Sequence, residues 1–216
     1  ERHEFQNRAL DFYHNSMWYR RGDPTRGSVE AGALEEFVRI PVPEDAGVGT
    51  FKDAAIVTLR SDWEIEGKLF KSGSLLSLKL SSCVAGIFSD IQVLFEPTAR
   101  SSLQDSVGTH NFMVLSILNN VRTELQYWRY LEQGRWEQMS SSEPGGEVPV
   151  GCDVQVSAVW PDESDEIWVI KDGYLQPDLL QLASAADCGA KPQDIKSKPA
   201  MFDASGLVVE QAEAES

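Results

Sequence analysis

The sequence has little positive charge for its length. Its 216 residues include 19 Lys and Arg against 34 Asp and Glu, which gives a formal net charge of −15 at pH 7. Nucleic-acid binding depends on clustered cations that neutralise phosphates, and the basic pairs here, such as Arg20-Arg21, are short. The composition therefore argues against a nucleic-acid partner.

Long hydrophobic runs are also missing. The longest, Phe112 to Leu115, ends at Ser116, whereas a membrane-spanning helix needs about 20 apolar residues. With 42% hydrophobic and 25% charged residues the chain has the composition of a globular protein. We expect a soluble or at most peripheral protein with no transmembrane segment.

Cysteines are few and widely spaced. Cys83, Cys152 and Cys188 form no CxxC motif and no Cys/His ligand spacing, so neither a zinc site nor a disulfide framework is indicated. This mildly favours a reducing compartment. The chain starts at Glu1 rather than Met and shows no signal or transit peptide, which leaves a cleaved targeting peptide open and the compartment unknown.

The machinery of serine hydrolysis is absent from the sequence. That chemistry needs a nucleophile on a G-x-S-x-G elbow, a His base and an acid. Gly73-Ser74 continues into an expected strand, and Asp203 replaces the first glycine before Ser205. The only histidines are His3, His14 and His110. We predict no catalytic residues, and hence a chain that is not itself an enzyme.

Cofactor and metal signatures are equally weak. The acids from Asp162 to Glu166 run into Ile167-Trp168 and lack the spacing of a calcium loop, so they predict an acidic turn before a strand. Gly47-Val48-Gly49 lacks the rest of a phosphate-binding loop. Glu35 and Glu36 would point apart in a strand. The predicted sets of cofactor-binding and metal-binding residues are empty, and no cofactor is expected.

What the sequence does contain is a series of strand patterns. Apolar residues alternate with polar ones at Leu76, Leu78 and Leu80, from Ile91 to Phe95 and from Val121 to Tyr127, the period of a strand with one buried face. Three short, nearly continuous apolar runs predict strands buried on both faces: 54–59, 112–118 and 167–170.

Turn residues separate these strands. Hairpins are expected at Asn119-Asn120, Glu66-Gly67-Lys68, Gln133-Gly134 and Lys171-Asp172-Gly173, since Asn and Gly accept positive φ. Two stretches, 22–35 and 140–151, predict long surface loops. The stretch 175–186 comes closest to a helix but fits a strand equally well.

The strands group into bundles that begin near residues 8, 53, 108 and 154. This spacing approaches the repeat length of propeller blades, each a four-stranded antiparallel sheet. We expect an all-β, antiparallel fold: a single partial β-propeller domain over 1–216, of about three to four blades, with approximate bounds 8–52, 53–107, 108–153 and 154–211.

Six tryptophans lie in or beside the expected strands. Because Trp covers large apolar areas of sheets, their first interpretation is packing between blades, and the second is contact with a protein partner. They are Trp18, Trp63, Trp128, Trp136, Trp160 and Trp168. Trp63 is expected to be mostly buried.

Several segments, in order, resemble the β-propeller of the prolyl oligopeptidase family. They include the stretch Leu59-Arg60-Ser61-Asp62-Trp63, the connection Leu94-Phe95-Glu96-Pro97-Thr98 with Arg100 to Leu103, the hairpin Leu118-Asn119-Asn120-Val121-Arg122, the turn Pro161 to Asp165 with Gln176-Pro177, and Phe202-Asp203-Ala204-Ser205-Gly206. The resemblance covers roughly residues 8–211. The loops 22–35 and the stretch around Gly145-Gly146 look inserted relative to compact members of the family.

The resemblance implies a function without catalysis. In the family the propeller covers the active site and restricts access to short peptides, and the last segment leads into the catalytic α/β-hydrolase domain, which is absent here. We therefore expect a non-catalytic propeller segment whose partners are the missing blades, the catalytic domain or foreign subunits. The alternative is a peptidase-derived structural or accessory subunit docked in a larger protein assembly.

Overall fold

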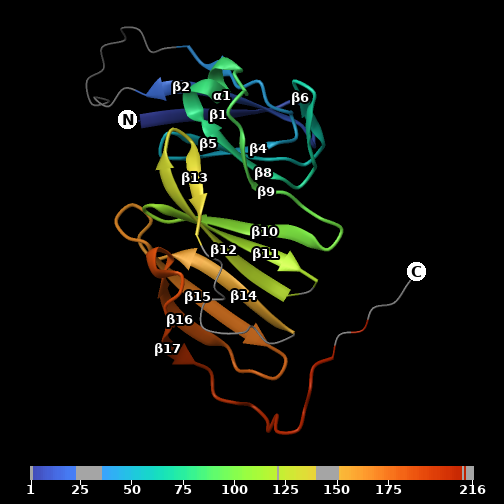
Figure 1. Cartoon of the computed structure of the whole chain (residues 1–216), viewed down its shortest axis with the longest axis vertical. Coiled ribbons are helices and arrows are strands. Elements are labelled where there is room, and N and C mark those ends of the chain that lie inside the picture. Colours follow the sequence, from blue (N-terminus) through green and yellow to red (C-terminus); the bar gives the residue numbers. More distant parts are fainter. Residues whose placement is uncertain (1, 23–35, 121, 140–150, 211, 213–216) are drawn as a thin grey trace. The chain divides into compact units, whose positions relative to one another are not determined.

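Antiparallel strands form nearly all of the regular structure (Figure 1). The computed structural model describes residues 2–22, 36–120, 122–139, 151–210 and 212. The all-β, antiparallel prediction is confirmed, and the sheets are consistent with a β-propeller-like domain. The chain divides into two compact units, one of Glu1–Glu96 with Glu132–Arg135, the other of Pro97–Leu131 with Trp136–Ser216.

In its described residues, the first unit contains two sheets and a small hairpin. One sheet has the order β1-β2-β3, formed by Arg2–Ala9, Asn15–Gly22 and Val38–Arg39. The other has the order β4-β5-β8-β9, formed by Gly47–Phe51, Ala54–Thr58, Leu75–Lys79 and Gln92–Phe95. The hairpin of β6 (Trp63–Ile65) and β7 (Lys68–Phe70) is inserted between β5 and β8.

A short helix, α1 (Leu80–Ala85), follows β8 directly. It ends at Gly86, whose φ of 72° lets its N–H donate to the carbonyl of Cys83. The prediction that Leu80 continues the strand was wrong. Leu80 is buried from the first helical turn instead, and Ser77 is as buried as its neighbours, so β8 is covered on both faces rather than alternating. With α1 this short, the described part of the chain holds no helix able to cross a membrane.

The second unit contains two regular four-stranded sheets in sequence order. The first comprises β10 (Ser101–Gly108), β11 (Phe112–Asn119), β12 (Arg122–Glu132) and β13 (Arg135–Gln138). The second comprises β14 (Cys152–Ala158), β15 (Glu166–Gly173), β16 (Leu179–Ser184) and β17 (Gln193–Ser197), with the 3₁₀ turn η1 (Ala185–Asp187) after β16.

Three of the four hairpin predictions are confirmed. Glu66-Gly67 have φ values of 49° and 77°, and Gln133-Gly134 have 55° and 76°, the pattern of a type I′ turn. Asn120, between β11 and β12, has φ 52°. These conformations match the right-handed twist of the strands that they join.

The fourth hairpin prediction, at Lys171-Asp172-Gly173, was wrong. These residues continue β15 and pair with β14, Gly173 lying opposite Cys152. A side chain at position 173 would put its Cβ 2.5 Å from the Cys152 sulfur. The glycine thus serves close cross-strand packing rather than a turn.

The remaining predictions concern the stretch 175–186, the two long loops and the assignment of blades. Of 175–186, which fitted helix or strand, residues 179–184 form β16. The predicted long loops 22–35 and 140–151 lie almost entirely outside the described residues. The four large sheets span residues 2–39, 47–95, 101–138 and 152–197. Their assignment as blades of one propeller domain, with the bounds given above, stays a prediction.

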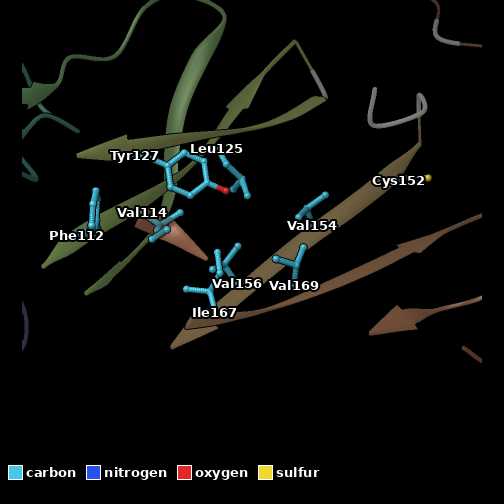
Figure 2. Packing of buried hydrophobic residues seen from close by; sticks show 10 residues of the cluster. Phe112, Val114, Leu125, Tyr127, Cys152, Val154, Val156, Ile167 and Val169 are labelled. Carbon is cyan, nitrogen blue, oxygen red and sulfur yellow. The ribbon is translucent and has the colours of Figure 1, made fainter. Parts of the chain in front are cut away.

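Each unit has its own buried apolar cluster. In the second unit, residues of β11 and β12 face residues of β14 and β15 (Figure 2), namely Phe112, Val114, Leu125, Tyr127, Cys152, Val154, Val156, Ile167 and Val169, with Ala185 of η1. In the first unit the cluster combines the β5 and β8 side chains with Ile40, Leu59, Phe70, Leu80 and Cys83. Burial of this apolar surface is the main favourable term in folding.

Candidate functional site

The three histidines lie in separate places. The His3 Nδ1 lies 3.1 Å from the Tyr19 hydroxyl, and the His110 Nδ1 lies 2.8 Å from the Asp162 carbonyl. His14 pairs with Asp11. Among the described residues, no Ser, Thr or Cys side chain hydrogen-bonds His14. The described structure therefore assembles no nucleophile–histidine pair.

The serines considered for catalysis lie apart from these histidines. Ser74 is buried just before β8, and Ser205 follows a turn in which its N–H donates to the Asp203 carboxylate at 2.9 Å. Gly47 and Gly49 lie within β4, and the acids at 162–163 form a turn before β15, as predicted. The described residues also gather no cluster of three or more metal-ligating side chains.

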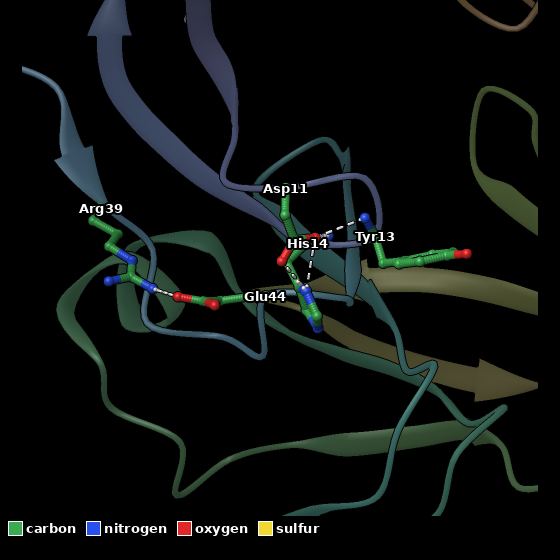
Figure 3. Close-up of polar contacts among 5 residues, drawn as sticks. All are labelled: Asp11, Tyr13, His14, Arg39 and Glu44. Atoms are coloured by element: carbon green, nitrogen blue, oxygen red, sulfur yellow. Dashed lines mark hydrogen bonds and ion pairs between the residues drawn. The ribbon is translucent and has the colours of Figure 1, made fainter.

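The most organised polar feature of the first unit is the loop between β1 and β2 (Figure 3). The Asp11 Oδ1 accepts the backbone N–H groups of Tyr13 and His14, both at 2.8 Å. The same carboxylate lies 2.8 Å from the His14 Nδ1. The backbone N–H of Leu10 donates to the His14 carbonyl at 2.9 Å. One aspartate side chain thus closes the loop, as Asx turns do.

These contacts polarise both side chains. The backbone N–H of Tyr13, then the hydrogen bond with His14, hold the pKa of Asp11 below its usual range. Hydrogen bonding and charge attraction from Asp11 raise the pKa of His14, and the charges of Glu44 and Asp45 add to this. Both partners are well exposed, so solvent screens the pair and its contribution to stability is small.

Beside this loop, the segment that follows β3 is fixed by backbone and side-chain contacts. The Asn15 N–H donates to the Glu44 carbonyl at 2.8 Å, and the Ala46 N–H donates to the Pro43 carbonyl at 3.0 Å. The Arg39 guanidinium pairs with the Glu44 carboxylate at 2.6 Å (Figure 3). The segment between β3 and β4 is therefore held against the start of β2.

A cavity of about 240 Å³ lies along this segment. Its polar wall carries the side chains of Asn7, Asn15, Arg39, Asp45 and Arg60. The cavity is smaller than the roughly 300–1,000 Å³ of pockets for drug-sized ligands. It offers both cationic donors and a carboxylate acceptor within a strongly acidic protein.

Part of the lining of this cavity is apolar, with contributions from Met17, Ile40, Val42, Pro43 and Val48. Ile40 is only 1% exposed and belongs to the core of the unit. The cavity thus combines a mostly polar lining with an apolar part against the core, and is more polar than most small-molecule pockets.

A larger cavity, about 480 Å³, lies in the second unit. Three aspartates line it, Asp153, Asp172 and Asp178, together with Tyr174. Asp178 is already paired with Lys198. The remaining acids provide acceptors only, so nothing in the lining specifies one ligand.

No motif in the sequence indicates the smaller cavity. Its polar residues lie as far apart in the chain as Asn7 and Arg60, and strand pairing brings them together. The spacing of Asp11 and His14 across a short polar turn was the available local clue, since Asp readily bonds backbone groups two or three residues later.

The tryptophans divide by burial. Trp128 and Trp136 are buried, at 7% and 4% exposure, as predicted for sheet packing. Trp18, Trp63 and Trp168 are half-buried. Trp160, at 65% exposure, contradicts the packing interpretation because it lies in the turn beyond β14 rather than on a strand.

No family model matches this sequence. Among known proteins, the chain is 31% identical over 208 residues to the uncharacterized peptidase y4nA of Sinorhizobium fredii, a match covering 94% of the chain and 26% of that protein. It is 23% identical over 181 residues to the uncharacterized peptidase RP174 of Rickettsia prowazekii, covering 82% of the chain and 24% of that protein. The chain thus spans about a quarter of the length of these relatives.

Solved structures share the fold. A post-proline cleaving enzyme from Rickettsia typhi matches 97% of the chain and 28% of its own length, with a TM-score of 0.78 and 22% identity. Oligopeptidase B from Trypanosoma brucei matches 93% of the chain and 28% of its own length, with a TM-score of 0.55 and 12% identity. The resemblance to the prolyl oligopeptidase family that the sequence motifs indicate is confirmed.

Proposed function

We propose that this chain is a non-catalytic β-propeller segment of a prolyl oligopeptidase-type serine peptidase. The observation that carries the proposal is the 31% identity with a peptidase over nearly the whole chain but only a quarter of the relative. The fold match to a post-proline cleaving enzyme supports it. The sequence itself contains no G-x-S-x-G elbow.

In this proposal the chain acts by shape rather than by chemistry. The two sheets of the second unit pack through a buried apolar cluster, and such close packing makes a rigid wall. As part of a propeller, such a wall would cover the active site of the peptidase and admit only short peptides. Rigid sheets suit the exclusion of long peptides because a barrier that excludes by size must keep its shape.

The first experiment tests catalysis. Purified residues 1–216 are incubated with a Gly-Pro p-nitroanilide substrate, beside a complete peptidase of the family as positive control. We expect no release of nitroaniline by the chain alone. Turnover that a serine-reactive phosphonate abolishes, and that His14→Ala also removes, would overturn the non-catalytic assignment.

The second part of the proposal concerns a protein partner. Large apolar side chains near the end of the second unit are exposed, including Met201 at 89% and Val208 at 76%. Exposed apolar side chains in number mark interaction sites. The partner proposed first is the remainder of a peptidase. The alternative is a foreign assembly in which the chain serves as a structural or accessory subunit.

Sedimentation and amide exchange test this part. We expect the chain alone to self-associate or exchange rapidly, and to become protected when a partner covers an interface of more than about 1,000 Å². Protection by the separately expressed remainder of the y4nA peptidase selects the peptidase over a foreign assembly. A monodisperse, fully protected monomer at micromolar concentration would contradict the need for any partner.

A further inference from the structure

We propose that the 240 Å³ cavity of the first unit binds a small zwitterion with an apolar side chain, that is, a free amino acid or a dipeptide. This inference does not rest on the function proposed above. Three features of the cavity support it: which of its polar side chains are already engaged, how their charges balance, and how the backbone beneath them is fixed.

Three polar side chains of the cavity remain available to a ligand. Within the described residues, no hydrogen bond or ion pair engages the side chains of Asn7, Asn15 or Arg60. Arg39, by contrast, is paired with Glu44 at 2.6 Å. Asp45 accepts the Ser61 hydroxyl on its Oδ1 at 3.1 Å, which leaves its Oδ2 available. The cavity therefore presents one uncommitted guanidinium, one half-used carboxylate and two amides.

These four side chains favour a ligand that carries both a positive and a negative charge. Arg60 can grip a carboxylate through two parallel hydrogen bonds. Asp45 can accept from an ammonium group, and the two amides can serve as donors or acceptors. Asp45 would repel a purely anionic ligand, and Arg60 would repel a purely cationic one. A zwitterion satisfies both, and burying an unpaired charge is costly.

The apolar wall and the size restrict the ligand further. Val42 and Pro43, both half-buried, offer a surface for an aliphatic side chain. The volume lies below that of pockets for drug-sized ligands. One or two amino-acid residues fit that description, whereas a longer peptide or a nucleotide does not.

The backbone that carries two of these polar side chains is fixed by hydrogen bonds. The Arg60 carbonyl accepts the Ser72 hydroxyl at 2.7 Å, and the N–H of the preceding Leu59 donates to the Ser74 carbonyl at 3.0 Å. On the other side, Asn15 is tied to Glu44 through its backbone. Such pre-organisation lowers the entropic cost of binding.

The test is an NMR titration of residues 1–216 with L-alanyl-L-alanine, observing the side-chain amides of Asn7 and Asn15. Three blocked analogues accompany it: the N-acetylated dipeptide, the dipeptide amide, and the doubly blocked form. The dipeptide should shift both amides at concentrations up to about 10 mM, within reach of a millimolar affinity. Each blocked form should bind at least about tenfold more weakly.

Two variants assign the charges. Arg60→Gln should weaken dipeptide binding about tenfold and abolish the preference for the free carboxylate over the amide. Asp45→Asn should abolish the preference for the free amine over the acetylated form. Arg135→Gln, an exposed arginine outside the cavity, is the matched control and should change nothing. Ser61→Ala tests whether the Asp45 variant acts only by loosening its loop, and it should leave binding intact.

The inference fails if no shift occurs at 10 mM, the concentration at which a millimolar site would be nearly filled. It also fails if all four peptides bind equally, or if Arg135→Gln weakens binding as much as Arg60→Gln. If Arg60→Gln does not fold, Arg60→Lys keeps the charge without the bidentate geometry. That variant should then bind the dipeptide more weakly than the wild-type chain, and equal binding would count against the inference.

Discussion

Two aspartates, one in each unit, use nearly the same hydrogen bonds to different ends. Asp11 bonds two backbone N–H groups and a side chain within its own loop. Asp165 accepts the backbone N–H of Asn111 at 2.6 Å and the hydroxyl of Thr109 at 2.8 Å, from residues more than fifty positions earlier. The first arrangement shapes a turn, and the second ties one sheet to the next.

From this difference we expect sequence separation, more than bond geometry, to decide how much a polar contact contributes to stability. A local bond forms in a turn that the unfolded chain already samples, so little is gained on folding. A long-range bond exists only when both sheets are in place. It is also partly shielded from water, which reduces screening. The second unit should therefore depend on its polar contact more than the first.

The apolar clusters repeat this contrast. The cluster of the second unit is built from four regular strands, and Trp136, 4% exposed, lies edge-to-face on Tyr130 at 4.9 Å between ring centroids. In the first unit, Trp63 is half-buried and lies edge-to-face on Phe88 at 5.0 Å. Similar ring pairs thus occur at different depths, which allows depth to be tested separately from ring contact.

The largest effect is expected from Trp136→Ala. Removing a fully buried Trp costs about 3–5 kcal/mol of unfolding free energy, from lost burial and the cavity left behind. Urea unfolding followed by circular dichroism measures it. Trp160→Ala is the matched control, and at 65% exposure it should change stability by less than about 0.5 kcal/mol. Equal losses from both substitutions would show that the second unit does not gain its stability from buried rings.

The next largest effect is expected from Asp165→Ala. Loss of hydrogen bonds to a charged acceptor should cost about 1–2 kcal/mol, reduced from the value for a fully buried group because solvent still reaches this carboxylate. Asp162→Ala, in the same turn but with an exposed side chain, is the control and should be near neutral. If the two variants lose equal stability, the long-range bonds to Asp165 contribute nothing special.

The same variant has a pH signature. Partial burial acts to raise the pKa of Asp165, but hydrogen bonds from Asn111 and Thr109 outweigh it and hold the pKa below its usual range. Stability from a lowered pKa is present above the ordinary value of 3.8 and is lost as pH falls through the folded value. Asp165→Ala should therefore flatten the decline in stability of the wild-type chain below about pH 4.

The sequence predicted the strands well because their signals are local. Alternation located β9 and β12, a nearly continuous apolar run located β11, and positive φ at Gly67 and Gly134 followed from the residues themselves. Local rules failed where packing decided the outcome. Position 173 needs a glycine because a side chain there would collide with the Cys152 sulfur on the neighbouring strand. No turn propensity could indicate this contact.

Local sequence patterns did not predict the candidate site. Its wall joins Asn7 of β1 to Arg60 beyond β5, and no motif links them. What could be read was the absence of a catalytic elbow and the resemblance to one family, because both depend on contiguous residues. A cavity depends on which strands meet, and the sequence alone left the register of those strands unspecified.

A smaller effect is expected from Trp63→Ala in the first unit. A partly exposed ring loses less transfer free energy on truncation than a fully buried one, so about 1–2 kcal/mol is expected, including the contact with Phe88. The measurement is the urea midpoint, in parallel with Trp136→Ala. A loss as large as that of Trp136 would mean that depth does not distinguish the two units.

The smallest effect on stability, and the most local, is expected from Asp11→Asn. The amide oxygen can still accept the N–H groups of Tyr13 and His14, so the loop should persist. The charge is lost, however, and the pKa of His14 should fall toward its ordinary value of 6.5, because Asp11 is the main cause of its rise. In the wild-type chain the pair is at full strength above 3.8 and below 6.5, the ordinary values of its members. It weakens as pH rises through the folded pKa of His14, or falls through that of Asp11.

An NMR titration of the His14 ring measures the shift. Asp45→Asn is the matched control, since Asp45 is the last of the causes that raise this pKa, and it should lower the value by less. If Asp45→Asn lowers the pKa of His14 as much as Asp11→Asn does, the imidazole responds to the general negative charge of the protein rather than to its hydrogen-bonded neighbour. Asp11 would then not be an example of a specific local contact, and the contrast with Asp165 would fail.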